Sequence, residues 1–352
     1  MTQLRPPPLR HPRLTQLLGA LLPILLAFCV TSALQNWVGS ITIYTKAQEP
    51  SRQVLHDAIL HNAPPPGATW ESIGARSTNL RIAIVLIAET VHTVTGVSLP
   101  AVYFSIDSIC LFMFLLLLWH LLNTWFGPLF APIGWLYVAA VLPLTYFFHY
   151  FHPWDRISQL LWVGLIMTLR RRSFVAFALV LGCAVLAKFD AVMAPALYWL
   201  ANCHLKGFSR KLLLQTGVLF AISLGLFGML LLHVSEPGGP AAGKTLSLGI
   251  AQTLRLNIWN VVEMNWAYPP LLMHAIPALL AAIGWSASDQ VARAAAIFSV
   301  IYFLPSWLLG SNFHEVRAQL PLTILLLPCA LFGLQRLVAG CPQVTHGKEH
   351  AD

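Results

Sequence analysis

Residues 101–124, AVYFSIDSICLFMFLLLLWHLLNT, form an apolar run that decides the fold class. A helix needs about 20 predominantly apolar residues to cross a bilayer, and this run is long enough. The rest of the chain has the same character, since 57% of its 352 residues are hydrophobic and 10% are charged. A soluble domain carries roughly 45–50% apolar and about 25% charged residues. The composition therefore predicts an all-α polytopic membrane protein and excludes a cytosolic enzyme, a secreted disulfide scaffold and a disordered tail.

Further apolar runs accompany this one, so the sequence predicts about ten transmembrane helices. They lie near residues 14–34, 130–150, 156–169, 173–187, 190–204, 212–233, 266–285, 292–309 and 317–339. The first run is longer than the roughly 7–15-residue core of a secretory signal, so we interpret it as a retained helix. We predict a single transmembrane domain over residues 1–340 and a short cytoplasmic tail over residues 341–352.

Residues 35–100 form the longest stretch that is not uniformly apolar, and we predict that they form the first outer loop. Within this loop, residues 81–96, RIAIVLIAETVHTVTG, are apolar but carry Glu89 and His92. A helix that lies in the membrane interface fits this mixture better than a full span. We therefore expect the loop to hold a juxtamembrane, surface-lying helix.

The net charge of +8 is unevenly distributed along the chain. If ten spans begin inside, 12 of the 21 lysines and arginines fall in cytoplasmic segments. These are Arg5, Arg10, Arg13, Arg170, Arg171, Arg172, Lys206, Arg210, Lys211, Arg293, Arg336 and Lys348. Short loops rich in Lys and Arg face the cytoplasm, so both termini are predicted to be cytoplasmic. Because membrane segments separate these short clusters, we expect a lipid bilayer as partner and no nucleic acid.

The cysteine and histidine spacings give little support to a metal site. The six cysteines show no CxxC spacing, which excludes a thiolate site of the usual kind. His149 and His152 would share one face of a helix, but Pro153 favours a helix end directly after them. Further ligands for such a site would be His56, Asp57 and His314. We predict no metal and no cofactor, with a bound divalent metal ion as the alternative.

Under this topology, four groups of ionisable side chains fall at the outer ends of the helices. They are His56 with Asp57, residues 146–156 (YFFHYFHPWDR), Lys188 with Asp190, and His314 with Glu315 and Arg317. Ionisable groups at or inside the membrane are energetically costly and indicate function by default. The four groups are far apart in the sequence, yet the predicted topology places all of them on the same side of the bilayer. We therefore predict a site at the outer face.

Each group also has a structural explanation. Asp155 could stabilise a helix N-terminus, and Lys188 could pair with Asp190 or extend to the interface. The aromatic residues between 146 and 154 could form an interfacial belt. Loop solvation would account for Asp57, Glu315 and Arg317.

The order of these features resembles the C-type (GT-C fold) integral-membrane glycosyltransferases, which include protein O-mannosyltransferases and the lipid A aminoarabinose transferase. Those proteins have a first helix, then a long outer loop with a catalytic acid and surface-lying helices. A second acid follows the third helix, and short helices lead to a Lys or Arg near the lipid phosphate. The resemblance covers roughly residues 14–210. Residues 146–156 and 187–199 (AKFDAVMAPALYW) also look like stretches of uncharacterised bacterial members.

The resemblance implies transfer of a sugar from a polyprenyl-phosphate donor to a glycan, lipid or protein acceptor at the outer face of a bacterial inner membrane. Asp57 matches the first-loop acid, although the family often has an acidic pair where this chain has His56-Asp57. Asp155 matches the second acid, Lys188 the cation near the lipid phosphate, and Arg317 the late outer-face arginine. Further substrate contacts are expected from His56, His152, Arg156, Asp190 and Glu315.

The residue types fit this chemistry independently of the resemblance. The acceptor hydroxyl must lose its proton to a positioned carboxylate, for which Asp57 is the first candidate and Asp155 the second. The departing phosphate needs fixed positive charge, which Lys188 and Arg317 can supply. We therefore expect these four side chains to share one cavity at the outer leaflet.

Three other functions use charged residues in similar places. A transporter or lipid flippase would be favoured by inverted repeats, which the sequence does not show by eye. A polysaccharide polymerase would concentrate arginines in its outer loops, whereas the outer bases here are spread over four loops. A non-catalytic partner subunit of a polysaccharide assembly system is the third alternative.

The predicted topology can be tested with reporter fusions along the chain. Fusions at Arg171 and Ser209 should report a cytoplasmic location, and a fusion at Gly239 should report an external one, because of the distribution of basic residues. An external signal at Arg171 would overturn the topology and, with it, the predicted site.

Overall fold

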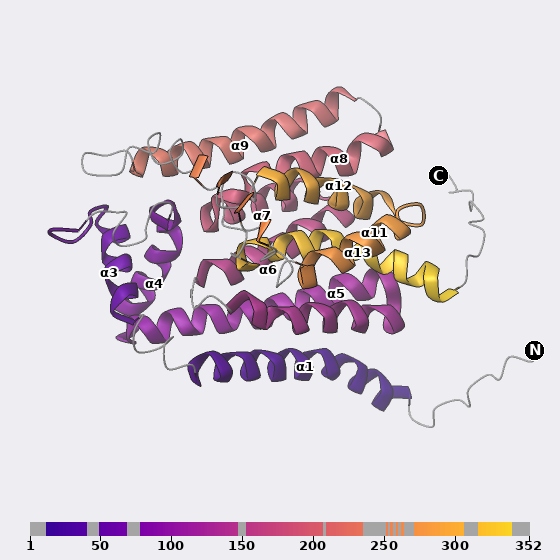
Figure 1. Ribbon diagram of the computed structural model, residues 1–352, viewed down its shortest axis with the longest axis horizontal. Helices are drawn as coiled ribbons and strands as arrows, with labels where there is room; N and C mark the ends of the chain where they lie inside the picture. The colour runs from indigo at the N-terminus through magenta and orange to yellow at the C-terminus, as the bar shows by residue number, and fades with distance from the viewer. Residues whose placement is uncertain are drawn as a thin grey trace, which may run out of the picture.

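The protein is described by a computed structural model (Figure 1), which covers residues 12–40, 49–68, 78–146, 153–206, 209–234, 271–305 and 316–339 and short pieces between 251 and 263. All regular secondary structure in these ranges is helical, so the predicted all-α fold class is confirmed for them. In chain order, the helices are α1 (Pro12–Ser40), α3 (Glu49–Leu60), η1 (Thr78–Arg81), α4 (Ile82–Thr95), α5 (Leu99–Val141), η2 (Leu142–Tyr146), α6 (Pro153–Arg170), α7 (Phe174–Ala187), η3 (Phe189–Met193), α8 (Ala194–Lys206), α9 (Arg210–Val234), η5 (Leu271–Ala275), α11 (Ile276–Gly284), α12 (Gln290–Pro305) and α13 (Val316–Ala339).

Most of these helices lie side by side, with α1 at one edge of the bundle and α9 at the opposite edge (Figure 1). Within the described residues, four helices are long and apolar enough to cross a membrane, and they contain Leu21–Val38, Leu99–Tyr146, Arg210–His233 and Gln319–Ala339. Shorter apolar helices lie between them, at Phe174–Ala187, Met273–Gly284 and Gln290–Tyr302. The chain is therefore a membrane protein, while the number of about ten spans stays a prediction.

Helix α5 reverses its direction at Gly127 and consists of two antiparallel segments. Gly127 has φ 65° and ψ −170°, a conformation that residues with a Cβ atom rarely adopt. The Trp135 indole N–H donates to the Leu115 carbonyl oxygen at 2.9 Å, which places the two segments next to each other. They correspond to the separate apolar runs that the sequence shows over residues 101–124 and 130–150.

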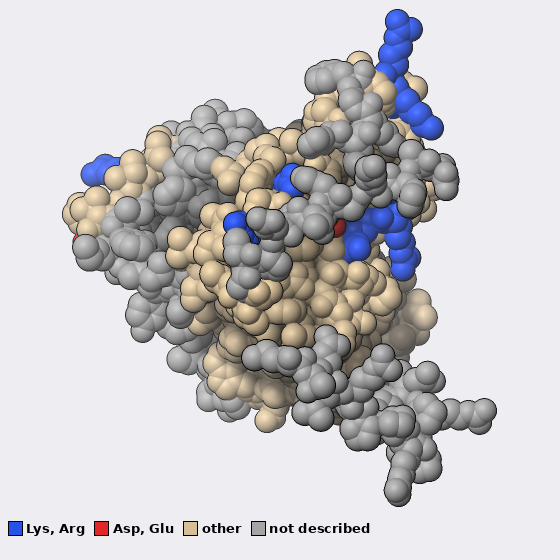
Figure 2. Space-filling view, turned by 90° about the vertical axis from the view of Figure 1, so that its right-hand side faces the viewer, with Lys and Arg blue, Asp and Glu red and all other residues tan. Residues whose placement is uncertain are grey.

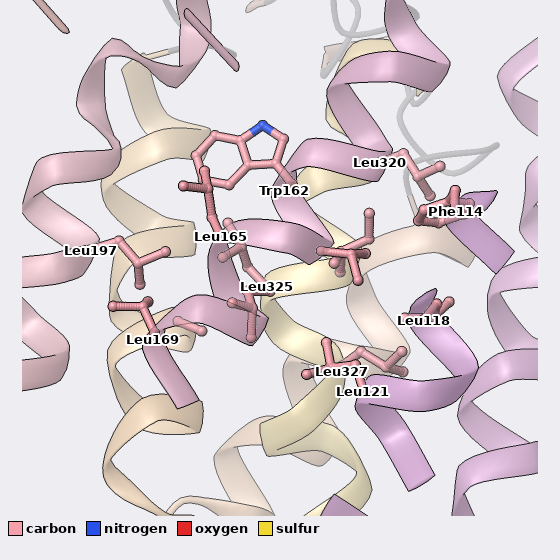
Figure 3. Packing of buried hydrophobic residues seen from close by; sticks show 14 of the residues in the cluster. Phe114, Leu118, Leu121, Trp162, Leu165, Leu169, Leu197, Leu320, Leu325 and Leu327 are labelled. Carbon is pink, nitrogen blue, oxygen red and sulfur yellow. The ribbon is translucent and has the colours of Figure 1, made fainter. Parts of the chain in front are cut away.

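Helix α13 lies in the middle of the bundle and contacts α5, α6, α11 and α12. Figure 3 shows Trp162 of α6 and Phe114 of α5 in the packed interior, among leucines of α5, α6, α8 and α13. Lipid tails are as apolar as leucine, so membrane helices associate through close van der Waals packing. This packing fixes the positions of α5, α6 and α13, whose ends reach the candidate site.

Helices α11 and α13 meet at two glycines. A Cβ atom added at Gly333 would lie 2.0 Å from the Leu280 carbonyl oxygen. One added at Gly284 would lie 2.2 Å from the Cys329 carbonyl oxygen. Small residues allow helix backbones to approach closely in membranes, and here only a hydrogen atom fits between them.

Helices α3 and α4 lie at one end of the bundle and run across the direction of the long helices (Figure 1). Helix α4 covers the residues for which the sequence predicts a surface-lying helix. Its Ile84 and Ala88 pack against Trp154 in a buried apolar cluster. Leu86 and Ile87 on its other side are 49% and 52% exposed. Helix α4 therefore presents one apolar face to the protein and another to its surroundings, and its position in the membrane interface stays a prediction.

The opposite end of the bundle carries basic side chains. Figure 2 views this end and shows Lys and Arg spread over it, with little Asp or Glu among the described residues. Arg336 donates to the Ser286 hydroxyl and Arg293 to the Ser286 carbonyl, so α12 and α13 place both arginines beside the α11–α12 turn. Such an excess of basic residues is typical of a cytoplasmic surface. The orientation of the chain in the membrane stays a prediction.

The contact between α11 and α13 makes a sharp prediction about stability. Gly333→Ala should destabilise the protein by about 1–3 kcal/mol, because the added methyl group overlaps backbone atoms that cannot move independently. The matched control is Gly225→Ala in α9, where nothing lies within 4 Å of an added Cβ atom. The control should be neutral or stabilising by up to about 1 kcal/mol. Thermal denaturation in detergent measures both, and equal midpoints for the two variants would contradict the close packing.

Candidate functional site

The candidate site lies at the end of the bundle that carries α3 and α4. The first turns of α5 and α6 meet the last turns of α1, α7 and α12 there (Figure 1). Three groups of polar side chains occupy this end, and each is named after one member. The lysine cluster comprises Asp155, Lys188, Asp190 and Tyr302; the arginine cluster comprises Gln35, Asp107, Thr145, Tyr146, Arg156 and Gln159; the histidine cluster comprises His56, Glu89 and Tyr103.

The lysine cluster joins three helical elements through one ammonium group. Lys188 Nζ lies 3.1 Å from Asp155 Oδ1 and 3.3 Å from Asp190 Oδ2. The Tyr302 hydroxyl donates to Asp190 Oδ2 at 2.8 Å. Lys188 and Asp155 are 6% and 5% exposed, so this ion pair is buried. It connects the start of α6 to the end of α7, and Tyr302 attaches α12 to the same group.

The local fold explains why Lys188 points at these carboxylates. Lys188 ends α7 in an extended conformation, with φ −158° and ψ 117°, and η3 begins directly after it. Burial by itself lowers the pKa of Lys188, but Asp155 and Asp190 outweigh this effect and raise the pKa above its usual value. The ammonium group is therefore charged at neutral pH. The Arg81 guanidinium lies 4.7 Å from the Trp154 ring centroid, next to Asp155 in the chain.

The arginine cluster surrounds the guanidinium group of Arg156. Its Nε donates to the Tyr146 hydroxyl at 3.0 Å, its Nη1 to Gln159 Oε1 at 2.9 Å and its Nη2 to the Thr145 hydroxyl at 2.7 Å. The guanidinium also lies 4.3 Å from the Tyr146 ring centroid. A fork of several donors in fixed positions suits Arg better than Lys. Arg156 thus fastens the start of α6 to η2.

Asp107 is the carboxylate partner of this cluster. Its Oδ1 lies 3.7 Å from Arg156 Nε, and its Oδ2 accepts hydrogen bonds from the Tyr146 hydroxyl at 3.1 Å and from the Gln35 amide. Asp107 is 1% exposed. Asp155 and Arg156 are consecutive residues, so the lysine and arginine clusters are adjacent.

The histidine cluster attaches α3 to α4 and α5. His56 Nδ1 shares a hydrogen bond with the Tyr103 hydroxyl at 2.8 Å, and His56 Nε2 lies 3.1 Å from Glu89 Oε2. His56 is buried, with 3% of its surface exposed. Tyr103 and Asp107 are four residues apart on α5 and therefore lie on the same face of that helix. The histidine cluster is thus one helical turn from the arginine cluster.

The structure brings several predicted site residues together. Asp155, Lys188 and Asp190 are in direct contact, and Arg156 neighbours them. His56 lies in the histidine cluster and does not contact the lysine cluster through any described hydrogen bond. Asp57 on α3 is exposed and accepts a hydrogen bond from Gln53 at 3.3 Å.

The other predicted residues fall at the margins of the described chain. His152 and Glu315 lie outside the described residues, as do His149 and His314. Arg317 is the second residue of α13, and its side chain is likewise outside the description. Among the described residues, no three His, Cys, Asp or Glu side chains gather closely enough to hold a metal ion.

Sequence reasoning missed Asp107, Gln35 and Tyr302 as members of these clusters. The signal for Asp107 was present, because it is a single carboxylate inside the apolar run over residues 101–124. An ionisable residue within a membrane segment is a site candidate by default. Gln35 and Tyr302 gave no such signal, since their partners are distant in the sequence.

The fold and the clusters define an all-helical membrane protein with a buried network of ion pairs at one end of its bundle. Comparisons with known proteins give no match to any protein-family model, curated protein or solved structure.

Removal of the Lys188 charge should destabilise the fold. Lys188→Met leaves Asp155 and Asp190 buried without their cation, and breaking a buried pair in this way costs about 3–5 kcal/mol. Lys188→Arg keeps the charge and should lose less. Asp57→Asn, which alters an exposed carboxylate, should change the unfolding free energy by less than about 0.5 kcal/mol. Thermal denaturation in detergent provides the measurement; a Lys188→Met protein as stable as Asp57→Asn would show that the buried contact contributes nothing.

Proposed function

We propose that the chain is a membrane glycosyltransferase that moves a sugar from a polyprenyl-phosphate donor to an acceptor at the extracytoplasmic face of a bacterial inner membrane. The observation that carries this proposal is the contact between Asp155 and Lys188, two residues that the sequence argument assigned to one site. A buried ion pair at the end of a membrane helix bundle is costly to maintain and is a candidate for function.

The proposed reaction exchanges one bond at the anomeric carbon of the sugar. The bond from this carbon to the phosphate oxygen of the donor breaks, and the polyprenyl phosphate leaves with the electron pair. The acceptor oxygen forms the new bond to the anomeric carbon and gives its proton to a carboxylate. The site must therefore supply a base for the acceptor and positive charge for the departing phosphate.

Lys188 is proposed to stabilise the departing phosphate. An ammonium group has three N–H donors, and contacts with Asp155 and Asp190 engage two of them. The third is proposed to bind a phosphate oxygen of the donor. Asp155 and Asp190 are positioning residues in this scheme, because they fix the ammonium group and keep it charged. Arg81, stacked on Trp154, is a second cation near the same point.

Asp57 is proposed as the general base. Its side chain is exposed, so an acceptor hydroxyl can reach it. The neighbouring His56 is buried and bound to Tyr103 and Glu89, which holds this turn of α3 in place. Asp155 is the weaker candidate, because it is buried and in contact with Lys188, so an acceptor hydroxyl reaches it less easily.

A non-catalytic membrane protein, either a transporter or flippase or the partner subunit of an assembly system, is the second candidate. The observation that favours it is the extent of pairing in the network. The Lys188 ammonium contacts two carboxylates, and the Arg156 guanidinium has protein partners at all three nitrogens. Such pairing is also what a purely structural network requires.

The two candidates can be separated by assaying glycosylated product in membranes supplied with a polyprenyl-phosphate sugar. Asp57→Asn should slow transfer by about 10²–10⁴-fold, because an amide keeps the shape of the carboxylate but cannot accept the proton. Lys188→Ala should raise the KM for the donor and lower kcat, because the charge acts on bound and departing phosphate alike. Lys188→Arg should recover part of the loss.

The controls decide between the proposed roles. Each variant is first shown to elute as a folded protein from gel filtration in detergent, so that loss of activity is not loss of fold. Full activity in Asp57→Asn together with an inactive, folded Asp155→Asn would transfer the role of base to Asp155. Full activity in both acid variants would make the charges structural and favour the non-catalytic candidate.

A further inference from the structure

A groove of about 730 Å³ runs along the seam between α1 and α5. It is lined by Phe28, Thr31, Ser32, Gln35 and Asn36 of α1 and by Phe104, Ser108, Ile109 and Phe112 of α5. Helix α1 lies at the edge of the bundle beside α5 (Figure 1), and Phe28, Phe104 and Ile109 of the lining are 62%, 49% and 62% exposed, so the groove opens at the surface of the bundle. Its volume is within the roughly 300–1,000 Å³ of small-molecule sites.

The polarity of the groove changes along its length. Four lining residues of α1 carry hydroxyl or amide groups, namely Thr31, Ser32, Gln35 and Asn36. They lie in the part of α1 nearest the candidate site. Phe28 lies a turn further from that end on α1, and Ile109 and Phe112 do so on α5, whereas Phe104 of α5 is an apolar lining residue near the candidate site. A lipid in a bilayer leaflet has the same arrangement, with a polar head at the interface and an apolar tail below it.

Two of the polar side chains are nine-tenths buried and incompletely bonded. Thr31 and Gln35 are 8% and 5% exposed. Thr31 Oγ1 and Gln35 Oε1 have no hydrogen-bond partner among the described residues, although the Gln35 amide group donates to Asp107. A buried polar atom without a partner is costly and calls for an explanation, of which a bound group is one. Gln35 therefore links the groove to the arginine cluster.

We propose that this groove binds a lipid whose headgroup is uncharged and carries hydroxyl groups. Among the described residues, no charged side chain lines the groove, so the described lining offers no cation to a phosphate headgroup. Ser32 and Asn36 are exposed in the lining, and their side chains can exchange hydrogen bonds with such hydroxyl groups. The tail lies along Phe28, Ile109 and Phe112.

The bulk of the lining argues for a lipid over a second transmembrane helix. Helices in membranes pack through small residues that let their backbones approach. Here Phe28, Phe104 and Phe112 stand along the seam, and such large side chains keep another helix at a distance. A flexible chain can follow the space between them.

The role of the bound lipid rests on the proposed function. If the chain transfers a sugar, the lipid in this groove is the acceptor, and its hydroxyl group is glycosylated at the neighbouring site. The donor phosphate is then bound separately, at Lys188 and Arg81. The binding itself does not depend on this role and can be measured without activity.

The test uses the full-length protein in vesicles of phosphatidylethanolamine and phosphatidylglycerol that contain monoglucosyl diacylglycerol with a photoreactive acyl chain. Cross-links should map to α1 residues near Phe28 and to α5 residues near Phe112. Ser108→Trp, which fills the groove, should reduce them about tenfold, equivalent to ~1.4 kcal/mol of binding energy. The matched control is Ser105→Trp on the same helix, because Ser105 is exposed, makes the same kind of bond to the backbone and does not line the groove.

Each outcome decides a different point. Cross-links spread evenly over the lipid-facing helices, or unaffected by Ser108→Trp, would overturn the groove proposal. Cross-linking from the groove to a second copy of the chain would do the same and identify a helix as the occupant. Specific cross-links in a protein without transferase activity would leave the lipid site intact and contradict the proposed function. Transferase activity that Ser108→Trp leaves unchanged, without specific cross-links, would contradict the groove alone.

Discussion

The ammonium group of Lys188 lies between two carboxylates, 3.1 Å from Asp155 and 3.3 Å from Asp190, where α6, α7 and η3 meet. A charge at this depth cannot be hydrated as it is in water, so it must be paired with opposite charge. Each partner sits on a different element, and Tyr302 extends the contact to α12. The pairing requirement of one side chain therefore fixes the relative positions of several helix ends, and the remaining polar residues are arranged around them.

Helix α5 carries this arrangement to the surface helices. Tyr103 and Asp107 are one turn apart on the same face, and each is the α5 partner of one cluster. Between and around these polar groups, Trp154 and Tyr146 pack against Ile84 and Ala88 of α4. Apolar contact and hydrogen bonding thus act together. Packing holds α4 against the ends of the long helices, and the hydrogen bonds of His56 to Tyr103 and Glu89 fix the orientation of α3. A movement of α3 or α4 would consequently shift α5 and, with it, the contact between Asp107 and Arg156.

The sequence was sufficient to predict the all-helical membrane fold and to bring Asp155, Lys188 and Asp190 to the same end of the bundle, because apolar length and the one-sided distribution of charge are local signals. It was insufficient for contacts that depend on how helices cross. Nothing in the apolar run around Gly333 indicates that its partner is Gly284. A glycine has no side chain, so its sequence position does not show which backbone approaches it. Asp57 was the favoured acid by its position in the loop, yet its neighbour His56 takes the buried position on α3. A helical turn decides which of two adjacent residues faces inward, and the loop sequence around them is too irregular to define that turn.

The location of the network bears on the transporter alternative in physical terms. A transporter needs its charged residues near the middle of the membrane, where the substrate crosses between two states. Here the charges come from the first turns of α5 and α6, from Lys188 at the end of α7 and from Asp190 of η3, and they gather at one end of the bundle. Pairs such as Asp107 with Arg156 resist separation, because each partner would be left buried and uncompensated. A fully paired network at one end of the bundle, beside the groove between α1 and α5, suits a protein that holds its ligands in place better than one that carries a substrate across.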